Sequence, residues 1–387
     1  MIDILLSTYN GEAFLREQLD SILNQTYSDF KILIRDDGSA DSTVNIIKDY
    51  VFKYPLKIVC INIPAPRPSS TLSTCPLPYD EGGLERGRGY NAGFYYDNKN
   101  NSKKHLGFNL SYNELLNCST ADYIMFSDQD DVWLPEKVEI SFKKIKELEK
   151  EFQGKPILVH SDLTVVNKDL KIINGSFFRH IGINPYENSL NRLIMQNTVT
   201  GCTMLINKNL AALAKPISDG VYFYDYWFAL VAKMFGAIGV INKPLLLYRQ
   251  HDSNVIGAGA NSLRKLVKKL NIINDLYRQG CLLYKRYYDY SGHKNDTNDT
   301  NDTNDKNDKN GKNGYEGNDG DYGYGGIKNG IKNEAQIILR NFIELGSANP
   351  LKRLYVIFKY RFFRQGLLRN MGFLLFLVFF IDLKSGI

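Results

Sequence analysis

The sequence lacks the patterns that mark secretion, disulfide frameworks and zinc sites. Its five cysteines follow no Cys-x-x-Cys or Cys-x-x-His spacing, which favours reduced thiols in a cytoplasmic protein. The N-terminus turns polar at Ser7 with no basic segment before it, so we expect no signal peptide. The one long apolar run, Gly372–Ile381, is about half of the ~20 residues that a spanning helix requires, so we expect no transmembrane span.

Acidic residues are absent from the range 351–370, although the chain as a whole has a net charge of only +6. The basic residues there are Lys352, Arg353, Lys359, Arg361, Arg364 and Arg369. Such a bias suits an anionic membrane surface better than a nucleic acid, and we expect no nucleic-acid partner. Because 351–387 is also rich in aromatic residues, two interpretations stay open. It forms an interfacial helix pair at a membrane, or its aromatic side chains pack against the rest of the chain.

Strand and helix signals alternate in the first third of the chain. Apolar runs that predict strands and periodic segments that predict helices follow one another as Ile2–Ser7, Phe14–Leu23, Phe30–Ile34, Val44–Ile47 and Leu56–Ile61. This order predicts an α/β fold whose sheet is mostly parallel, with right-handed crossovers. Ligands of such sheets bind at the carboxyl ends of the strands, where the polar turns of this segment lie.

Two segments interrupt the pattern. The range 64–102 is rich in Pro, Ser, Gly, Tyr and Asn without a periodic apolar face, and we expect a disordered insertion. The range 292–326 includes Asn-Asp-Thr and Asn-Asp-Lys repeats and predicts a flexible linker. We therefore divide the chain into an N-terminal domain, 1–258, and a helical C-terminal region, 259–387.

The most informative stretch is Ser127–Asp131, which follows the predicted strand Tyr123–Phe126. Its carboxylates at 128, 130 and 131 repel one another unless a cation holds them, and Mg²⁺ or Mn²⁺ is the ion that commonly bridges carboxylate and diphosphate. A solvated acidic turn that caps the next helix is the alternative. The stretch Asp36-Asp37-Gly38-Ser39 also follows a strand; it suits a nucleotide base, but by itself it fits a turn better.

Together these stretches resemble the family 2 inverting glycosyltransferases, which have the GT-A fold. The strings that carry the resemblance are Ser7-Thr8-Tyr9-Asn10, Gln25-Thr26-Tyr27, Arg35-Asp36-Asp37-Gly38-Ser39, Asp128-Gln129-Asp130-Asp131-Val132-Trp133 and Tyr248-Arg249-Gln250-His251-Asp252-Ser253-Asn254. The last string is similar to the rhamnosyltransferase branch that builds bacterial surface polysaccharides. The resemblance covers about 1–258 apart from the insertion, and makes this range the catalytic domain.

The resemblance implies roles for several residues on the donor side. Ser7, Tyr9 and Asp37 would line the nucleotide base and ribose, and Asp128 would face the ribose. Asp130 would be the ligand of a divalent metal, Mg²⁺ or Mn²⁺. Arg249 would neutralise diphosphate charge as the leaving group departs. His251 would contact the diphosphate or complete the metal shell, and a structural role for it stays open.

On the acceptor side the resemblance implies roles for Asp131, Thr200, Gly201 and Trp227. An inverting transfer requires a carboxylate that takes the proton of the acceptor hydroxyl. Asp225 in Tyr224-Asp225-Tyr226-Trp227 occupies the family's position for this base, with a plain helix cap as the alternative. Relatives often have His-Asp-Trp-Trp here. The two tyrosines of this chain therefore leave acceptor preference open.

The implied activity is transfer of a sugar, with rhamnose as the family-level expectation, from a nucleotide-diphosphate donor to a saccharide or lipid-linked acceptor. We expect a cytoplasmic enzyme that is peripheral on the inner face of the membrane. A dinucleotide-dependent oxidoreductase would need a Gly-x-Gly-x-x-Gly turn, which the chain lacks after its first strand. A sugar-nucleotide nucleotidyltransferase and a catalytically degenerate binding protein remain as alternatives.

Overall fold

The structure is a computed structural model, and it describes residues 1–61, 88–91, 94–97, 105–218, 220–251, 262–296, 327–366 and 370. Most of the predicted insertion and linker lie outside these residues, as do the expected boundary at 258, Cys75 and the apolar run Gly372–Ile381. No disulfide joins the four cysteines that the structure describes.

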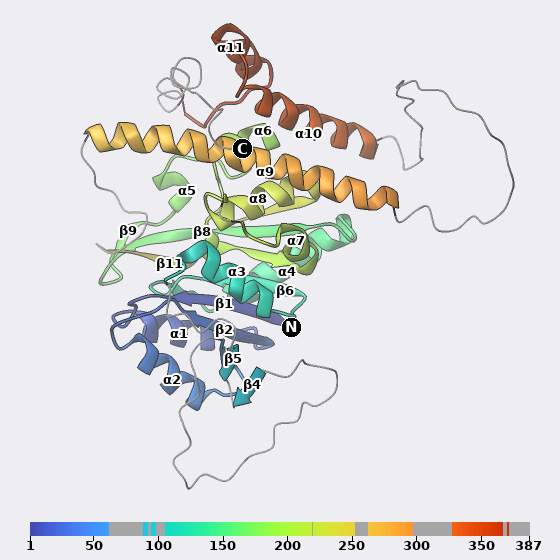
Figure 1. Cartoon of the computed structure of the whole chain (residues 1–387). Helices are drawn as coiled ribbons and strands as arrows, with labels where there is room; N and C mark the ends of the chain where they lie inside the picture. Colours follow the sequence, from blue (N-terminus) through green and yellow to red (C-terminus); the bar gives the residue numbers. More distant parts are fainter. Residues whose placement is uncertain are drawn as a thin grey trace, which may run out of the picture.

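One mixed sheet of 11 strands forms the centre of the molecule (Figure 1). Its strands are β1 (Ile2–Thr8), β2 (Phe30–Asp36), β3 (Ile58–Cys60), β4 (Arg88–Asn91), β5 (Phe94–Asp97), β6 (Tyr123–Ser127), β7 (Val132–Trp133), β8 (Ile157–Asn167), β9 (Ile172–Asn174), β10 (Leu205–Asn207) and β11 (Ala237–Gln250). They lie in the order β4-β5-β3-β2-β1-β6-β10-β8-β11-β7, and β9 pairs with β8. The strands β3, β2, β1 and β6 are parallel, as predicted, and β10 runs antiparallel between β6 and β8.

Helices cover both faces of this sheet, which is why its central strands are apolar on both sides. The helices on one face are α1 (Leu15–Leu23), α2 (Thr43–Lys53) and α4 (Lys137–Glu151). The helices on the other are α3 (Phe108–Cys118), α6 (Leu190–Met195), α7 (Lys208–Ala214) and α8 (Tyr224–Phe235). In β1, Ile4 and Leu6 belong to the first core and Leu5 to the second. The predicted α/β fold is confirmed.

The register of the parallel strands brings three polar turns to one edge of the sheet. Ser7 of β1 pairs with Arg35 of β2, and Leu6 of β1 pairs with Ser127 of β6. The residues that follow these strands therefore meet at the carboxyl ends, where α/β sheets bind ligands.

The expected insertion 64–102 contains secondary structure that the sequence pattern did not predict. The strands β4 and β5 pair antiparallel within it, and β5 joins the sheet beside β3. The edge strand β3 thus gains a backbone partner.

The C-terminal helices α9 (Ser262–Asp296), α10 (Ile327–Glu344) and α11 (Pro350–Lys359) lie beyond α6 and α8 (Figure 1). Leu283, Phe342 and Ile357 from these helices share one hydrophobic core with Phe228 of α8. The region is helical, as predicted, and it packs on the sheet domain. Among the helices that the structure describes, none combines the length and apolarity needed to cross a bilayer.

Candidate functional site

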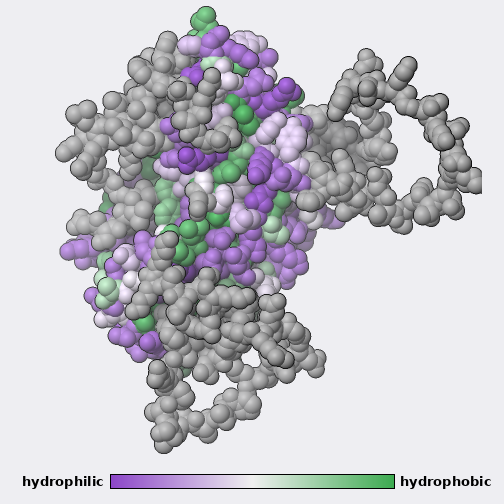
Figure 2. All heavy atoms as spheres, viewed as in Figure 1, coloured by the Kyte–Doolittle hydropathy of each residue, from purple (hydrophilic) through white to green (hydrophobic). Residues whose placement is uncertain are grey.

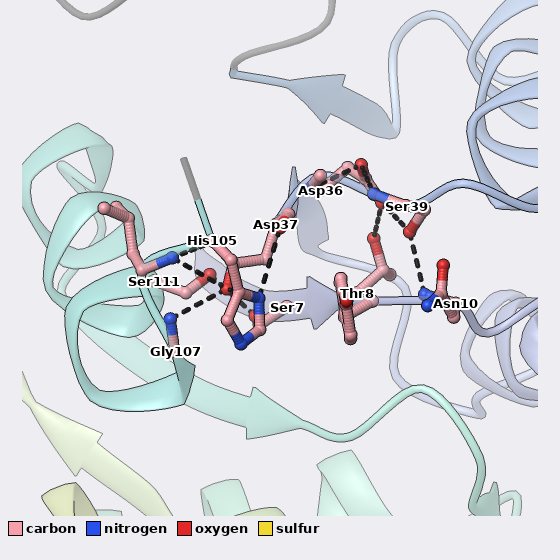
Figure 3. A network of polar contacts seen from close by, with 12 residues as sticks. Ser7, Thr8, Asn10, Asp36, Asp37, Ser39, His105, Gly107 and Ser111 are labelled. Atoms are coloured by element: carbon pink, nitrogen blue, oxygen red, sulfur yellow. Dashed lines mark hydrogen bonds and ion pairs between the residues drawn. The ribbon is translucent and has the colours of Figure 1, made fainter. Parts of the chain in front are cut away.

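Two of the polar turns are joined by hydrogen bonds (Figure 3). After β2, the Asp36 carboxylate accepts bonds from the backbone N–H groups of Gly38 and Ser39, at 3.1 and 2.9 Å, and from the Thr8 hydroxyl, at 3.0 Å. After β1, the Asn10 N–H donates to the Ser39 hydroxyl at 2.8 Å. Asp36 therefore shapes the turn and fixes it against the end of β1.

Asp37, the predicted nucleotide-binding carboxylate, is buried, and both of its oxygens have partners. It pairs with Arg35 at 2.6 Å and with His105 at 2.9 Å, and it accepts backbone N–H bonds from Leu106 and Gly107. Figure 3 shows His105 and Gly107 beside Asp37, at the start of α3. Asp37 thus holds the N-terminus of α3 against β2. A ligand that bonds to its carboxylate must displace one of these partners.

The rim above Asp37 is aromatic. Tyr9 is 45% exposed, and its ring lies 4.4 Å from the His105 ring, centroid to centroid. Ser7 is half-buried beneath them, and its hydroxyl contacts the Ser111 hydroxyl at 2.6 Å. Aromatic faces and hydroxyl groups of this kind suit the base and ribose of a nucleotide.

The acidic loop after β6 is attached to the first turn by Gln129. The Gln129 side chain accepts from the Tyr9 N–H at 2.8 Å and donates to the Tyr9 carbonyl at 2.9 Å. The close approach explains Gly11, because a Cβ there would lie 2.3 Å from the Gln129 amide oxygen. The pair of bonds fixes the loop relative to the Tyr9 rim.

Two of the three loop carboxylates form a cluster. Oxygens of Asp128 and Asp131 and the sulfur of Cys202 all lie within 4.8 Å of one another. Burial and the neighbouring Asp130 raise the pKa of Asp128 to about 7, and the same causes raise the pKa of Asp131 well above its usual value. Oδ2 of Asp131 is buried without a hydrogen-bond partner among the described residues. The raised pKa values mean that the charged forms of these carboxyls are unfavourable here unless a cation neutralises them.

Asp130 points to a different set of partners. Its carboxylate lies 2.8 Å from Nε2 of His251, which the sequence placed at the metal or diphosphate. Arg249 is buried beneath the loop. Its Nε donates to the Asp130 carbonyl at 2.8 Å, its guanidinium pairs with Glu17, and it stacks 4.6 Å from the Phe14 ring. Arg249 therefore supports the loop backbone. The side chains of Asp130 and His251 are partly buried, 16% and 14% exposed, and are more accessible than Arg249. The remainder of the predicted string, 252–254, lies outside the described residues.

A buried lysine lies behind the acidic cluster. Lys137 is fully buried at the start of α4, and its ammonium lies 3.5 Å from the centroid of the Trp133 ring. Burial lowers the pKa of Lys137 to about 7, and the charges of Cys202, Asp131 and Asp128 oppose that shift. Lys137 is thus a buried amine on the inner side of the cluster, and burial disfavours its positive charge.

Asp225 lies in the first turn of α8, as the sequence predicted. Its half-buried carboxylate accepts from the N–H of Gly201 at 3.2 Å and from the N–H of Tyr226 at 2.6 Å. Burial, reinforced by the charge of Asp128, raises the pKa of Asp225 to about 7, although the two N–H bonds act in the opposite direction. A carboxylate with this pKa can accept a proton near neutral pH.

The loop at Thr200–Gly201 approaches α8 closely. Thr200 is half-buried, and its carbonyl accepts from Thr203. A Cβ at Gly201 would lie 2.0 Å from the hydroxyl of Tyr224, which explains the glycine. The Tyr224 ring in turn packs 4.4 Å from Tyr112, whose hydroxyl donates to Asp128 at 3.2 Å. This chain of contacts joins Asp225 to the acidic loop.

Trp227, expected on the acceptor side, lies in the hydrophobic core. It is 2% exposed, and its indole N–H donates to the Ala214 carbonyl at 2.9 Å. Helical periodicity accounts for the difference, since Trp227 lies two positions after Asp225 and faces away from it. Its surroundings are those of a packing residue.

Several residues of the site were not identified from the sequence. They are His105, Tyr112, Gln129, Lys137 and Cys202. Gln129 lies inside the stretch Ser127–Asp131, and Lys137 lies six positions after its end. Their closeness to the acidic stretch was therefore a signal in the sequence. His105 and Cys202 reach the site from distant segments, and a lone His or Cys carries no pattern that separates it from a core residue.

Comparisons with known proteins agree with the predicted family. Residues 3–65 match the family model described as Glycosyl transferase family 2. A dTDP-rhamnosyl transferase, RfbG of Shigella flexneri, is 24% identical over 283 residues, which are 71% of this chain and 81% of the relative. The Escherichia coli enzyme UDP-Glc:alpha-D-GlcNAc-diphosphoundecaprenol beta-1,3-glucosyltransferase WfgD is 20% identical over 279 residues, 71% of this chain and 86% of the relative.

Among solved structures, S. aureus TarS 1-349 in complex with UDP-GlcNAc matches with a TM-score of 0.42 and 14% identity, over 93% of this chain and 88% of that one. A longer TarS structure is covered over only 39% of its length. The predicted resemblance is confirmed at the level of family and fold. The match to the family 2 glycosyltransferase model covers residues 3–65, and the sheet with helices on both faces has the arrangement expected of the GT-A fold.

Proposed function

We propose that the protein transfers a sugar from a nucleotide-diphosphate donor to a saccharide or lipid-linked acceptor, with inversion at the anomeric carbon, in cell-surface polysaccharide biosynthesis. The observation that carries this proposal is the position of Asp225. A half-buried carboxylate with a pKa of about 7 lies beside a cluster of acidic residues at the carboxyl ends of the parallel strands. A proton acceptor and a site for the cation that would neutralise the leaving diphosphate are the two parts that this sugar transfer requires.

The donor nucleotide would bind at the rim formed by Tyr9 and His105. Stacking on these rings and bonds to the Ser7 hydroxyl support a role in binding the base and ribose. Asp37 would act mainly by holding His105 and the start of α3, since its oxygens already have partners. Asp128, whose carboxylate accepts from Tyr112, would face the ribose side of the same edge.

The acidic loop fits a hard divalent ion. Asp128 and Asp131 supply clustered carboxylate oxygens, and Asp131 has a buried oxygen without a partner among the described residues. The Asp130 carboxylate lies in the same loop and contacts His251. Burial and the clustered carboxylates raise the pKa of the Cys202 thiol well above its usual value, which keeps the thiol protonated beside the cluster. We propose Asp130 as the principal ligand, with His251 beside it. When bound, Mg²⁺ or Mn²⁺ would neutralise the charge that develops on the leaving diphosphate.

Asp225 would take the proton from the acceptor hydroxyl. The hydroxyl oxygen then forms a bond to the anomeric carbon from the face opposite the diphosphate, the bond to the diphosphate breaks, and the electron pair leaves with it. Thr200 and Gly201 would line the acceptor side, because Gly201 bonds directly to the Asp225 carboxylate. Arg249 would act through the loop backbone that it supports. Trp227 would only anchor α8.

The finer assignments rest on the named relatives and on composition. Rhamnose is the proposed sugar, because a dTDP-rhamnosyl transferase is among the relatives. A lipid-linked acceptor is proposed because another relative acts on a diphosphoundecaprenol-linked sugar. We propose a cytoplasmic location that is peripheral on the inner face of the membrane. The scattered spacing of the five cysteines, without a Cys-x-x-Cys pattern, supports its cytoplasmic part.

A donor hydrolysis screen tests the proposal. Purified full-length protein is mixed with dTDP-rhamnose, UDP-glucose, UDP-GlcNAc or GDP-mannose in Mg²⁺, Mn²⁺ or EDTA, and release of nucleoside diphosphate is measured. We expect turnover with one donor class, dependent on the metal. Binding of a donor without turnover, with or without candidate acceptors, would favour a degenerate binding protein. Formation of pyrophosphate from a nucleoside triphosphate and a sugar phosphate would instead identify a nucleotidyltransferase.

A further inference from the structure

We propose that the outer face of α11 binds the surface of an anionic lipid bilayer. This face consists of Leu351, Leu354, Tyr355 and Phe358, which are 81%, 40%, 60% and 57% exposed. Their positions are i, i+3, i+4 and i+7, so they form one stripe along the helix. A contiguous exposed apolar stripe of this kind marks an interaction surface, whereas single exposed apolar residues do not.

The opposite face of α11 is already packed, so the outer face cannot turn inward. Val356 and Ile357 are buried at 3% and 0% exposure in the core that α11 shares with α8 and α10. Nε of Arg353 donates to the Leu345 carbonyl at 2.9 Å, and the Asn349 side chain caps the helix. The helix therefore has two apolar faces, and only one of them is used within the described part of the chain.

Charge identifies the partner. Lys352, Lys359 and Arg361 are exposed beside the stripe, and the sequence has no acidic residue between 351 and 370. The nearest described acidic partner is Glu344, 3.4 Å from Lys352. Figure 2 shows hydrophobic and hydrophilic residues side by side at the end of the molecule where Figure 1 places α11. Basic residues around an apolar stripe match the headgroups and acyl chains of an anionic leaflet.

The size of the surface favours a bilayer over a second protein. A helix of 10 residues is about 15 Å long, and its stripe is too small for the ~800 Å² per partner that stable protein interfaces bury. A lipid bilayer requires no minimum buried area of this kind, because the bilayer surface extends beyond the helix on all sides. Tyr355 suits the boundary between the lipid headgroups and the acyl chains in particular. The Lys359 ammonium lies 5.3 Å from its ring, so an apolar body and a charged tip are presented together.

This inference deepens the proposed function, on which its biological meaning rests, because a lipid-linked acceptor lies at such a surface. Binding to a bilayer does not require sugar transfer, so an experiment can contradict the membrane proposal without contradicting the proposed function, and the reverse. Full-length protein is sedimented with vesicles of phosphatidylcholine alone or mixed with phosphatidylglycerol, at low and high salt. We expect binding to the mixed vesicles, weakened by salt, and at most weak binding to phosphatidylcholine.

The variant Leu351→Ser, Leu354→Ser and Phe358→Ser should lower the vesicle partition coefficient at least tenfold. The matched control replaces two other exposed apolar residues, Phe52 (85% exposed) and Leu56 (78%), with serine, and should bind as the wild type does. These lie in and after α2, at the opposite end of the molecule in Figure 1. Both variants should hydrolyse the soluble donor at the wild-type rate.

Three results would overturn the proposal. The first is absence of binding to anionic vesicles, and the second is binding that the α11 serine variant leaves unchanged. The third is a concentration-dependent dimer in vesicle-free buffer that the same variant abolishes, since the stripe would then meet a second copy of the chain. Loss of donor turnover in every protein, with vesicle binding intact, would instead count against the proposed transfer chemistry.

Discussion

Replacing Asp225 with Asn should remove transfer and at the same time change stability in a pH-dependent way. Asparagine keeps the shape of the carboxylate but cannot accept a proton. We expect the transfer rate to fall at least about 100-fold, the usual contribution of a general base. Donor affinity should stay within about threefold, because Asp225 lies at the start of α8 and not at the Tyr9 rim.

The size of the stability effect follows from the shift of the Asp225 pKa from 3.8 to about 7. A shift of this size corresponds to at most about 4 kcal/mol in favour of the protonated folded state. The side chain is only half-buried and solvent screens part of its charge, so we reduce the effect to ~2 kcal/mol. Asparagine also loses one of the two bonds from Gly201 and Tyr226, at a cost of ~1 kcal/mol.

The sign of the effect changes with pH. The carboxyl has a raised pKa when folded, so the folded state holds the proton more tightly, and this stabilisation is lost as pH rises from about 4 to about 7. Below pH 4 the variant lacks only a hydrogen bond and should be less stable by ~1 kcal/mol. Above pH 7 it also avoids a buried charge and should be more stable by ~1 kcal/mol.

Thermal unfolding of both proteins from pH 4.5 to 8.5 measures this, with an expected reversal in the order of Tm and shifts of about 1–2 °C. The variant Asp169→Asn, at an exposed turn after β8, is the control and should follow the wild type. A constant Tm difference across this range would refute the assignment of a raised pKa to Asp225. Retained transfer would refute its role as the base, and wild-type kcat/KM should fall below about pH 7 if the role is correct.

Three further predictions concern separate parts of the site. Asp130→Asn should raise the Mn²⁺ concentration for half-maximal activity at least about tenfold. Direct measurement of bound Mn²⁺ by magnetic resonance should show the same loss of affinity. An unchanged affinity would exclude Asp130 as a ligand. Gln129→Ala removes both bonds to Tyr9 and should raise the donor KM about tenfold with little change in kcat, whereas an equal fall in kcat would argue for a chemical role. Trp227→Phe loses the bond to Ala214 and should lower the free energy of unfolding by about 1–2 kcal/mol, and an altered acceptor KM in that variant would restore Trp227 to the acceptor side.

Much of the site could be predicted because its residues follow buried strands. The apolar runs before Ser7, Asp36 and Asp128 give strands, and parallel strands bring their carboxyl ends together. Hydrophobic periodicity depends only on neighbouring residues, so each strand or helix can be predicted from its own segment of the sequence. The same reasoning failed for β4 and β5, because a short edge hairpin obtains its backbone partners from β3 and needs no apolar pattern of its own.

The sequence by itself determined the α/β order and the acidic loop after β6, because each depends on neighbouring residues, and the family resemblance implied the first-turn position of Asp225. Only the tertiary structure decided which polar groups are already satisfied and which face the site. Asp37 is bonded to Gly107, Gln129 to Tyr9, and Asp225 to Gly201. These partners lie 70, 120 and 24 residues apart along the chain. Only the folding of the sheet brings them within hydrogen-bonding distance, and no local pattern of residues records such pairs.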